Sequence, residues 1–219
     1  MRREFVFGLI IIGAIVMSIL LTGCEESSNP APGTTKIEIK TGTDDGGVVA
    51  LTDILPESVF GTLNGGGDQP FMVGLLTSGG GDNLTGRAIY RFDISGYENE
   101  NLTFHVKCVE KKGNPGNLEI YITNDSGSLP TNPSEMSDVS DTWNLISGGE
   151  KIATLTPSSG QWIDVAIPSS AIEPKVTENG HITIMLKLEN ENLGSNADYY
   201  ALSTYEYYQG SAKPYLSIP

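Results

Sequence analysis

The side chains best suited to hold a ligand in this sequence lie on a predicted strand. Arg87 and Arg91 alternate with an apolar set in residues 86–95, and that set is Ala88, Tyr90, Phe92 and Ile94. An apolar set at period two is typical of a strand that buries one face. The arginines lie on the other face, where Tyr121 and Lys187 of neighbouring strands could join them. Planar cations and aromatic rings together can hydrogen-bond and stack against a saccharide.

The same pattern also fits a solvated sheet face, with Arg87 or Arg91 paired to Asp93 or Glu206. Trp143 lies in a long polar stretch, residues 124–144, where it is a candidate for an exposed ligand contact. It could equally pack under that loop. We expect Trp162, on a later strand, to be buried.

Asp44 and Asp45 are the candidate metal ligands. They occupy a turn, residues 43–47, and Ca²⁺ gathers six to eight oxygen ligands, often from loops. Ordinary turn-forming acids are the alternative interpretation, and the sequence has no EF-hand spacing. The two histidines are far apart, so a zinc site is not expected. Calcium is therefore the one cofactor the sequence allows for.

The sequence does not predict an enzyme. His105 and His181 lie on predicted strands without an obvious Ser or Cys partner, and no Gly-x-Ser-x-Gly motif is present. Cys108 follows the apolar positions of its strand, so we expect an inert buried thiol.

The charge of the chain argues against nucleic acid as a partner. The formal net charge is −14, and residues 1–23 carry a net +1 from Arg2, Arg3 and Glu4, so their removal would leave −15. A field of that sign repels polyanions unless a local basic patch or a bridging cation intervenes.

The N-terminus has the features of an export signal. Two arginines precede an uncharged apolar run, which ends in Leu21-Thr22-Gly23-Cys24. This quartet resembles the lipobox of prokaryotic lipoproteins. The resemblance implies cleavage before Cys24, lipidation of its thiol, and a membrane-anchored, extracytoplasmic location. An uncleaved anchor helix is the alternative. Residues 24–35 are rich in Ser, Pro and Gly and read as a flexible linker, so one folded domain is expected over residues 36–219.

The rest of the domain predicts an all-β fold. Roughly ten alternating segments are separated by turns every eight to twelve residues, among 26 glycines and 12 prolines. Helices are limited to short turns, such as one near residues 168–172. A jelly-roll β-sandwich follows, in which residues 36–40 and 215–218 are expected to pair.

Four segments in order resemble the DNRLRE-type domains, also classed as family 96 carbohydrate-binding modules. They are residues 87–95 (RAIYRFDIS), 140–144 (SDTWN), 160–165 (GQWIDV), and 201–206 with 213–216 (ALSTYE, KPYL). The resemblance covers about residues 43–218. Tyr205 stands where the family has Arg, and Leu145 to Gly149 replace a family Pro. The resemblance implies an extracellular jelly roll that binds polysaccharide.

We therefore expect a non-catalytic, cell-surface lipoprotein that binds polysaccharide or a surface glycan. The expected contacts are Arg87, Tyr121, Trp143 and Lys187. The alternative is a structural or adhesion module that contacts protein or the surface layer and has no sugar site. A carbohydrate-active enzyme would need two carboxyl groups facing each other across a cleft.

Overall fold

The computed structural model describes most of the predicted domain. The described residues are 33–51, 59–64, 69–77, 83–127, 141–176, 178–191, 197–207 and 211–219. The predicted signal peptide and Cys24 lie outside these ranges, as does the linker up to residue 32. Among the described residues, no helix is long and apolar enough to cross a bilayer.

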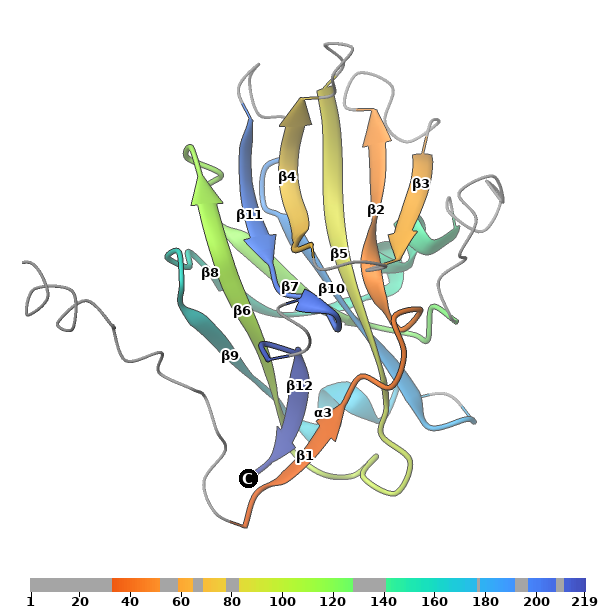
Figure 1. The fold of residues 1–219 in the computed structure, drawn as a ribbon. Coiled ribbons are helices and arrows are strands. Elements are labelled where there is room, and N and C mark those ends of the chain that lie inside the picture. The colour runs from red at the N-terminus through yellow and green to blue at the C-terminus, as the bar shows by residue number, and fades with distance from the viewer. Residues whose placement is uncertain are drawn as a thin grey trace, which may run out of the picture.

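Twelve strands account for most of the described chain, and their pairings are antiparallel (Figure 1). The strands are β1 (Thr35–Glu38), β2 (Asp45–Leu51), β3 (Val59–Asn64), β4 (Phe71–Thr77), β5 (Asn83–Asp93), β6 (Leu102–Lys112), β7 (Leu118–Thr123), β8 (Glu150–Leu155), β9 (Trp162–Ile167), β10 (His181–Leu188), β11 (Asp198–Leu202) and β12 (Tyr215–Ile218). Two short helical elements are η2 (Leu145–Gly148) and α3 (Ser169–Ile172). The sequence did not predict β3, but it did predict α3.

The strands form a β-sandwich, as predicted. The small sheet contains β9, β6, β12 and β1, and the large sheet contains β3, β2, β5, β10, β7 and β8, extended by β4 and β11. Strand β6 joins the two sheets, because it pairs with β12 near its start and with β11 near its end. The order β1-β12-β6-β11-β4-β5-β10-β7-β8 places strands distant in sequence side by side, as in a jelly roll. The predicted pairing of the two ends of the domain is confirmed, because β1 lies beside β12 at the bottom of Figure 1.

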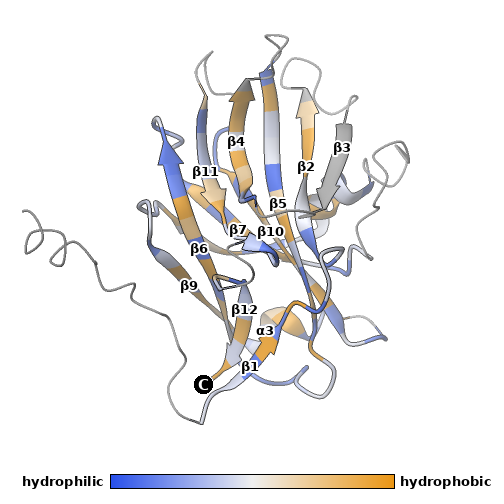
Figure 2. Cartoon of the chain, viewed as in Figure 1, coloured by the Kyte–Doolittle hydropathy of each residue, from blue (hydrophilic) through white to orange (hydrophobic). Residues whose placement is uncertain are grey.

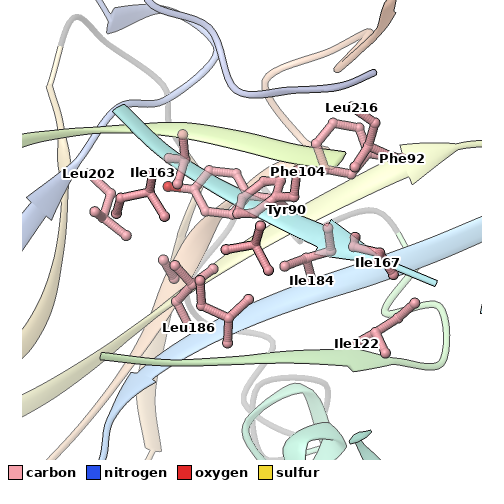
Figure 3. Close-up of a cluster of buried hydrophobic side chains, with 14 of the residues drawn as sticks. Tyr90, Phe92, Phe104, Ile122, Ile163, Ile167, Ile184, Leu186, Leu202 and Leu216 are labelled. Carbon is pink, nitrogen blue, oxygen red and sulfur yellow. The ribbon is translucent and has the colours of Figure 1, made fainter. Parts of the chain in front are cut away.

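The core lies between the inner faces of the two sheets (Figure 3). Tyr90 and Phe92 of β5 meet Phe104 of β6, with the Tyr90 and Phe104 ring centroids 5.5 Å apart. The predicted apolar set of β5 is fully buried, and along β6 the alternation of apolar and polar residues is visible in Figure 2. Cys108 is buried as well, and burial raises the pKa of its thiol to about 11. The core thus follows the period-two pattern of the sequence.

The outer face of the large sheet does not follow that pattern. Ile89 of β5 and Met185 of β10 point away from the core, yet both are fully buried. They form a second apolar cluster with Trp143, which belongs to a helical turn at residues 141–144. This turn and η2 therefore cover part of the large sheet.

Candidate functional site

All four predicted ligand contacts lie on the outer face of the large sheet. Arg87 comes from β5, Lys187 from β10 and Tyr121 from β7, while Trp143 reaches the face from the covering turn. The strand register explains the gathering, because Met185 aligns with both Ile89 and Tyr121. Side chains two residues apart on a strand share a face, so Arg87, Lys187 and Tyr121 lie on one surface.

Arg87 holds the helical turn at residues 141–144, which together with η2 we call the covering segment. Its Nε and Nη2 donate to the two carboxylate oxygens of Glu191 at 2.8 and 2.7 Å, and its Nη1 donates to the Trp143 carbonyl at 2.9 Å. The guanidinium also lies 3.6 Å from the centroid of the Trp143 ring. Trp143 is only 3% exposed, so it packs under the segment and is not an exposed contact. The bidentate partner is Glu191 and neither of the carboxylates that the sequence suggested.

Arg91, four residues after Arg87 on β5, makes a similar set of contacts. Its guanidinium donates to both oxygens of Asp125 at 2.6 and 3.1 Å, and to Asp44 Oδ1 at 2.9 Å. The hydrogen bond to Asp125 is the main reason that the pKa of Arg91 is raised, and the bond to Asp44 adds to it against the effect of burial. Arg91 thus ties the turn before β2 and the turn after β7 to the sheet.

Tyr121, Glu119, Lys187 and Lys151 form a second cluster on this face, which we call the Tyr121 group. The Glu119 carboxylate accepts hydrogen bonds from Tyr121 at 2.8 Å and from Lys151 and Lys187 at 2.9 Å each. Burial would raise the pKa of Glu119, but these three donors outweigh it and lower the pKa to about 2. Burial and the bond to Glu119 raise the pKa of Tyr121 to about 12.

The Tyr121 group is the accessible part of the face. The Tyr121 ring is half-buried, and Lys187 Nζ lies 5.9 Å from its centroid. The Lys151 side chain is 47% exposed, and its ammonium has three donors of which Glu119 occupies one. The group therefore offers a fixed aromatic ring beside ammonium donors at the surface.

A hollow of about 280 Å³ lies where the covering segment meets the end of β7. It is lined by Asn124, Asp141, Asn144, Leu145 and Gly148. Amide and carboxylate groups can donate and accept hydrogen bonds in a fixed geometry. These residues were not predicted from the sequence, although Asp141 and Asn144 lie on either side of Trp143 there.

The outer face of the small sheet carries a different cluster. The His105 ring stacks on Tyr215 with centroids 4.3 Å apart, and Trp162 meets Tyr215 edge-on at 6.1 Å. The prediction that Trp162 is buried was wrong, because it lies partly exposed at the start of β9 on this outer face. Strand alternation places Ile163, not Trp162, in the core.

His105 also has the serine partner that the sequence did not reveal. Its Nδ1 lies 2.6 Å from Asp164 Oδ1, and its Nε2 lies 2.8 Å from Ser217 Oγ. This is the connectivity of an Asp-His-Ser triad. However, Ser217 is only 6% exposed and its strand is paired on both sides, with Lys36 and Thr103 as its neighbours. The Ser217 hydroxyl is positioned to hold the His105 ring, not to attack a substrate.

The two acids suggested for calcium separate in the structure. Asp44 is ion-paired with Arg91, whereas Asp45 is fully buried and accepts a hydrogen bond from the Tyr205 backbone N–H. Burial is the main reason that the pKa of Asp45 is raised to about 7, and Glu206 adds to it by repulsion. Among the described residues, no three His, Cys, Asp or Glu side chains are grouped closely enough to hold a metal by themselves.

Comparisons with known proteins identify no family for this chain. No protein-family model matches it, and no curated protein matches it. Among solved structures, it is similar to the CBM22-1–GH10 modules of endo-1,4-β-D-xylanase 10B from Clostridium thermocellum, which were solved with xylohexaose. The TM-score is 0.37 and the sequence identity is 10%, over 84% of this chain and 28% of the other.

Proposed function

We propose that this protein binds polysaccharide without cleaving it, and that the Tyr121 group and the adjacent hollow form the binding site. The observation that carries the proposal is the fixed Tyr121 ring at the surface of a sheet face. Glu119 holds its hydroxyl at 2.8 Å, and Lys151 stands beside it with exposed donors.

This chemistry suits a sugar. A pyranose ring presents C–H groups on its flat faces and hydroxyls at its edge. An aromatic ring can cover the flat face, while ammonium, amide and carboxylate groups can satisfy the hydroxyls. Tyr121 would provide the stacking surface, and Lys151, Lys187, Asn124 and Asn144 would provide the polar contacts.

The local charge differs from that of the whole chain. The proposed site carries Arg87, Lys187 and Lys151 against Glu119, Glu191 and Asp141, so its formal charges balance in a chain of −14. A neutral glycan is therefore compatible with the site.

We further propose that the protein is held at the outer surface of a membrane through a lipid on Cys24. The lipobox-like quartet and the linker that follows it support this location. The resemblance to DNRLRE-type domains supports the same setting and remains a prediction.

A glycan array tests the function. The protein is screened against neutral and acidic glycans beside two variants, Tyr121→Ala and Trp162→Ala. We expect wild-type binding to be lost in Tyr121→Ala and kept in Trp162→Ala, which removes an aromatic ring from the opposite face. The absence of binding to any glycan would overturn the proposal and favour the structural or adhesion module.

A further inference from the structure

Two carboxylates with unsatisfied oxygens lie together at the start of β2. Asp45 is completely buried, and its Oδ2 accepts the backbone N–H of Tyr205. Its Oδ1 is shielded from water and has no hydrogen-bond partner within the described ranges, and the same holds for Oε2 of Glu206. Buried anionic oxygens without partners are costly, so they point to a missing positive charge.

The surrounding chain leaves space for these carboxylates by using glycine. A Cβ at Gly42 would lie 2.0 Å from Glu206 Oε1, so no other residue fits there without displacing that carboxylate. Gly42 lies in the turn that leads into β2, whose first residue is Asp45, and Tyr205 and Glu206 belong to the turn after β11. Two turns far apart in sequence thus enclose one acidic position.

No side-chain cation among the described residues neutralises this position. The nearby Arg91 is occupied by Asp44 Oδ1 and Asp125. Lys213 contacts the ring of Tyr205, with its Nζ 4.1 Å from the ring centroid, and its charge only partly offsets the effect of burial on Glu206, whose pKa remains raised.

We propose that this position binds a divalent cation, Ca²⁺, through Asp45 Oδ1 and the Glu206 carboxylate. Calcium takes six to eight oxygen ligands, and carboxylates, backbone carbonyls and water all serve. Two carboxylates supply part of that number, so main-chain oxygens of the two turns and water must supply the rest. The proposal replaces Asp44 with Glu206 in the pair that the sequence suggested, because both oxygens of Asp44 already accept hydrogen bonds, from Thr41 and Arg91.

Calcium at this position would join the two turns. It would tie the segment before β2 to the segment after β11, and through Asp44 and Arg91 it would stabilise one end of the large-sheet outer face. Its main effect is expected on stability, and the proposal does not depend on sugar binding.

Thermal unfolding with and without calcium tests the site. The purified protein is stripped with EDTA, and its melting temperature is measured at pH 7.5 after adding CaCl₂ or MgCl₂. For calcium at about a 100-fold excess over its dissociation constant, we expect a rise of roughly 5–10 °C. Magnesium should give a smaller rise, because it demands a regular octahedral shell. Isothermal titration calorimetry with CaCl₂ should give one site per chain.

Two variants and a control make the result specific. Asp45→Asn and Glu206→Gln should each remove the calcium-dependent rise, and should not lower the melting temperature of the metal-free protein, because each removes an uncompensated buried charge. Glu173→Gln, an exposed acid on another part of the surface, should keep the rise. A wild-type protein that neither binds calcium nor gains stability from it would overturn the proposal. So would a calcium response that survives both variants.

Discussion

The two outer faces of the sandwich carry similar residue types, but these residues make different contacts on each face. On the small sheet, Tyr215 contacts both His105 and Trp162, and the two ring nitrogens of His105 lie within hydrogen-bond distance of Asp164 and Ser217. On the large sheet, the arginines hold other segments of the chain against the sheet, while the Tyr121 group remains at the surface.

If the large-sheet face is the binding site, as we propose, an aromatic and polar surface is not sufficient by itself to make one. Tyr215 is 2% exposed, because its neighbours on the small sheet cover it. Tyr121 keeps part of its ring accessible, and its hydroxyl is hydrogen-bonded to Glu119. What distinguishes the large-sheet face is that its partly exposed ring, Tyr121, is hydrogen-bonded to Glu119 and stands beside the Lys151 and Lys187 ammonium groups, whereas the partly exposed Trp162 on the small sheet meets Tyr215.

The strongest test of this comparison is Arg87→Ala. This change removes a bidentate ion pair and the bond to the Trp143 carbonyl, leaving Glu191 without its partner. We expect a loss of about 3 kcal/mol in the free energy of unfolding, measured by urea denaturation. Arg87→Lys should recover only part of it, because an ammonium cannot make the bidentate contact. An unchanged unfolding midpoint in Arg87→Ala would show that Arg87 does not hold the covering segment.

Acid should weaken the large-sheet face. The pKa of Glu119 is about 2 in the folded protein, below its ordinary value of 4.5. Glu119 therefore contributes stability above pH 4.5, and this stability is lost as the pH falls towards 2. After allowing for solvent screening, we expect a loss of about 2 kcal/mol across that window. Glu119→Gln should remove this part of the acid dependence in pH-dependent urea unfolding. An identical acid profile in the variant would contradict the assignment.

The small-sheet face should respond to His105→Ala in stability alone. The variant loses two hydrogen bonds and the stack on Tyr215, for which we expect about 1 kcal/mol of destabilisation in chemical denaturation. Glycan binding by this variant should equal that of the wild type. A loss of binding in the folded variant would place the ligand on the wrong face for this account.

The smallest effect on stability is expected for Lys151→Ala. Because the Lys151 side chain is exposed, its ion pair with Glu119 should contribute little to the free energy of unfolding. Glycan affinity, measured by calorimetry, should fall even so, because an accessible donor is lost. Exposed Lys36, which pairs with Glu38 beside the small sheet, offers the matched control as Lys36→Ala. Equal glycan affinities in the two variants would remove Lys151 from the site.

Much of the fold could be predicted from the period-two pattern. The core face of β5 and the pairing of the chain ends followed from alternation and from the positions of the turns. The predicted face also contained Arg87, Tyr121 and Lys187, because every second side chain of a strand lies on the same face. This alternation could not show that Ile89 and Met185, on that same face, would be buried under the covering segment around Trp143.

The contacts between segments distant in sequence could not be predicted. Arg87 meets Glu191 across 104 positions, and His105 meets Ser217 across 112. Such pairs depend on the strand order of the sandwich, which the pattern of single strands does not contain. Glu206 could not be predicted as a metal ligand for the same reason, because only the fold brings it close to Asp45.

The two tryptophans of the chain provide the most direct test, because each reports on one outer face. The Trp143 indole lies between the large sheet and the covering segment, next in sequence to Asn144 of the hollow, and Trp162 lies on the small sheet. In a ¹⁵N–¹H correlation spectrum, with the indole signals assigned by Trp162→Phe, we would add the glycan that binds best on the array. We predict a saturable shift of the Trp143 signal and an unchanged Trp162 signal. A shift confined to Trp162 would contradict the account and place the ligand on the small sheet.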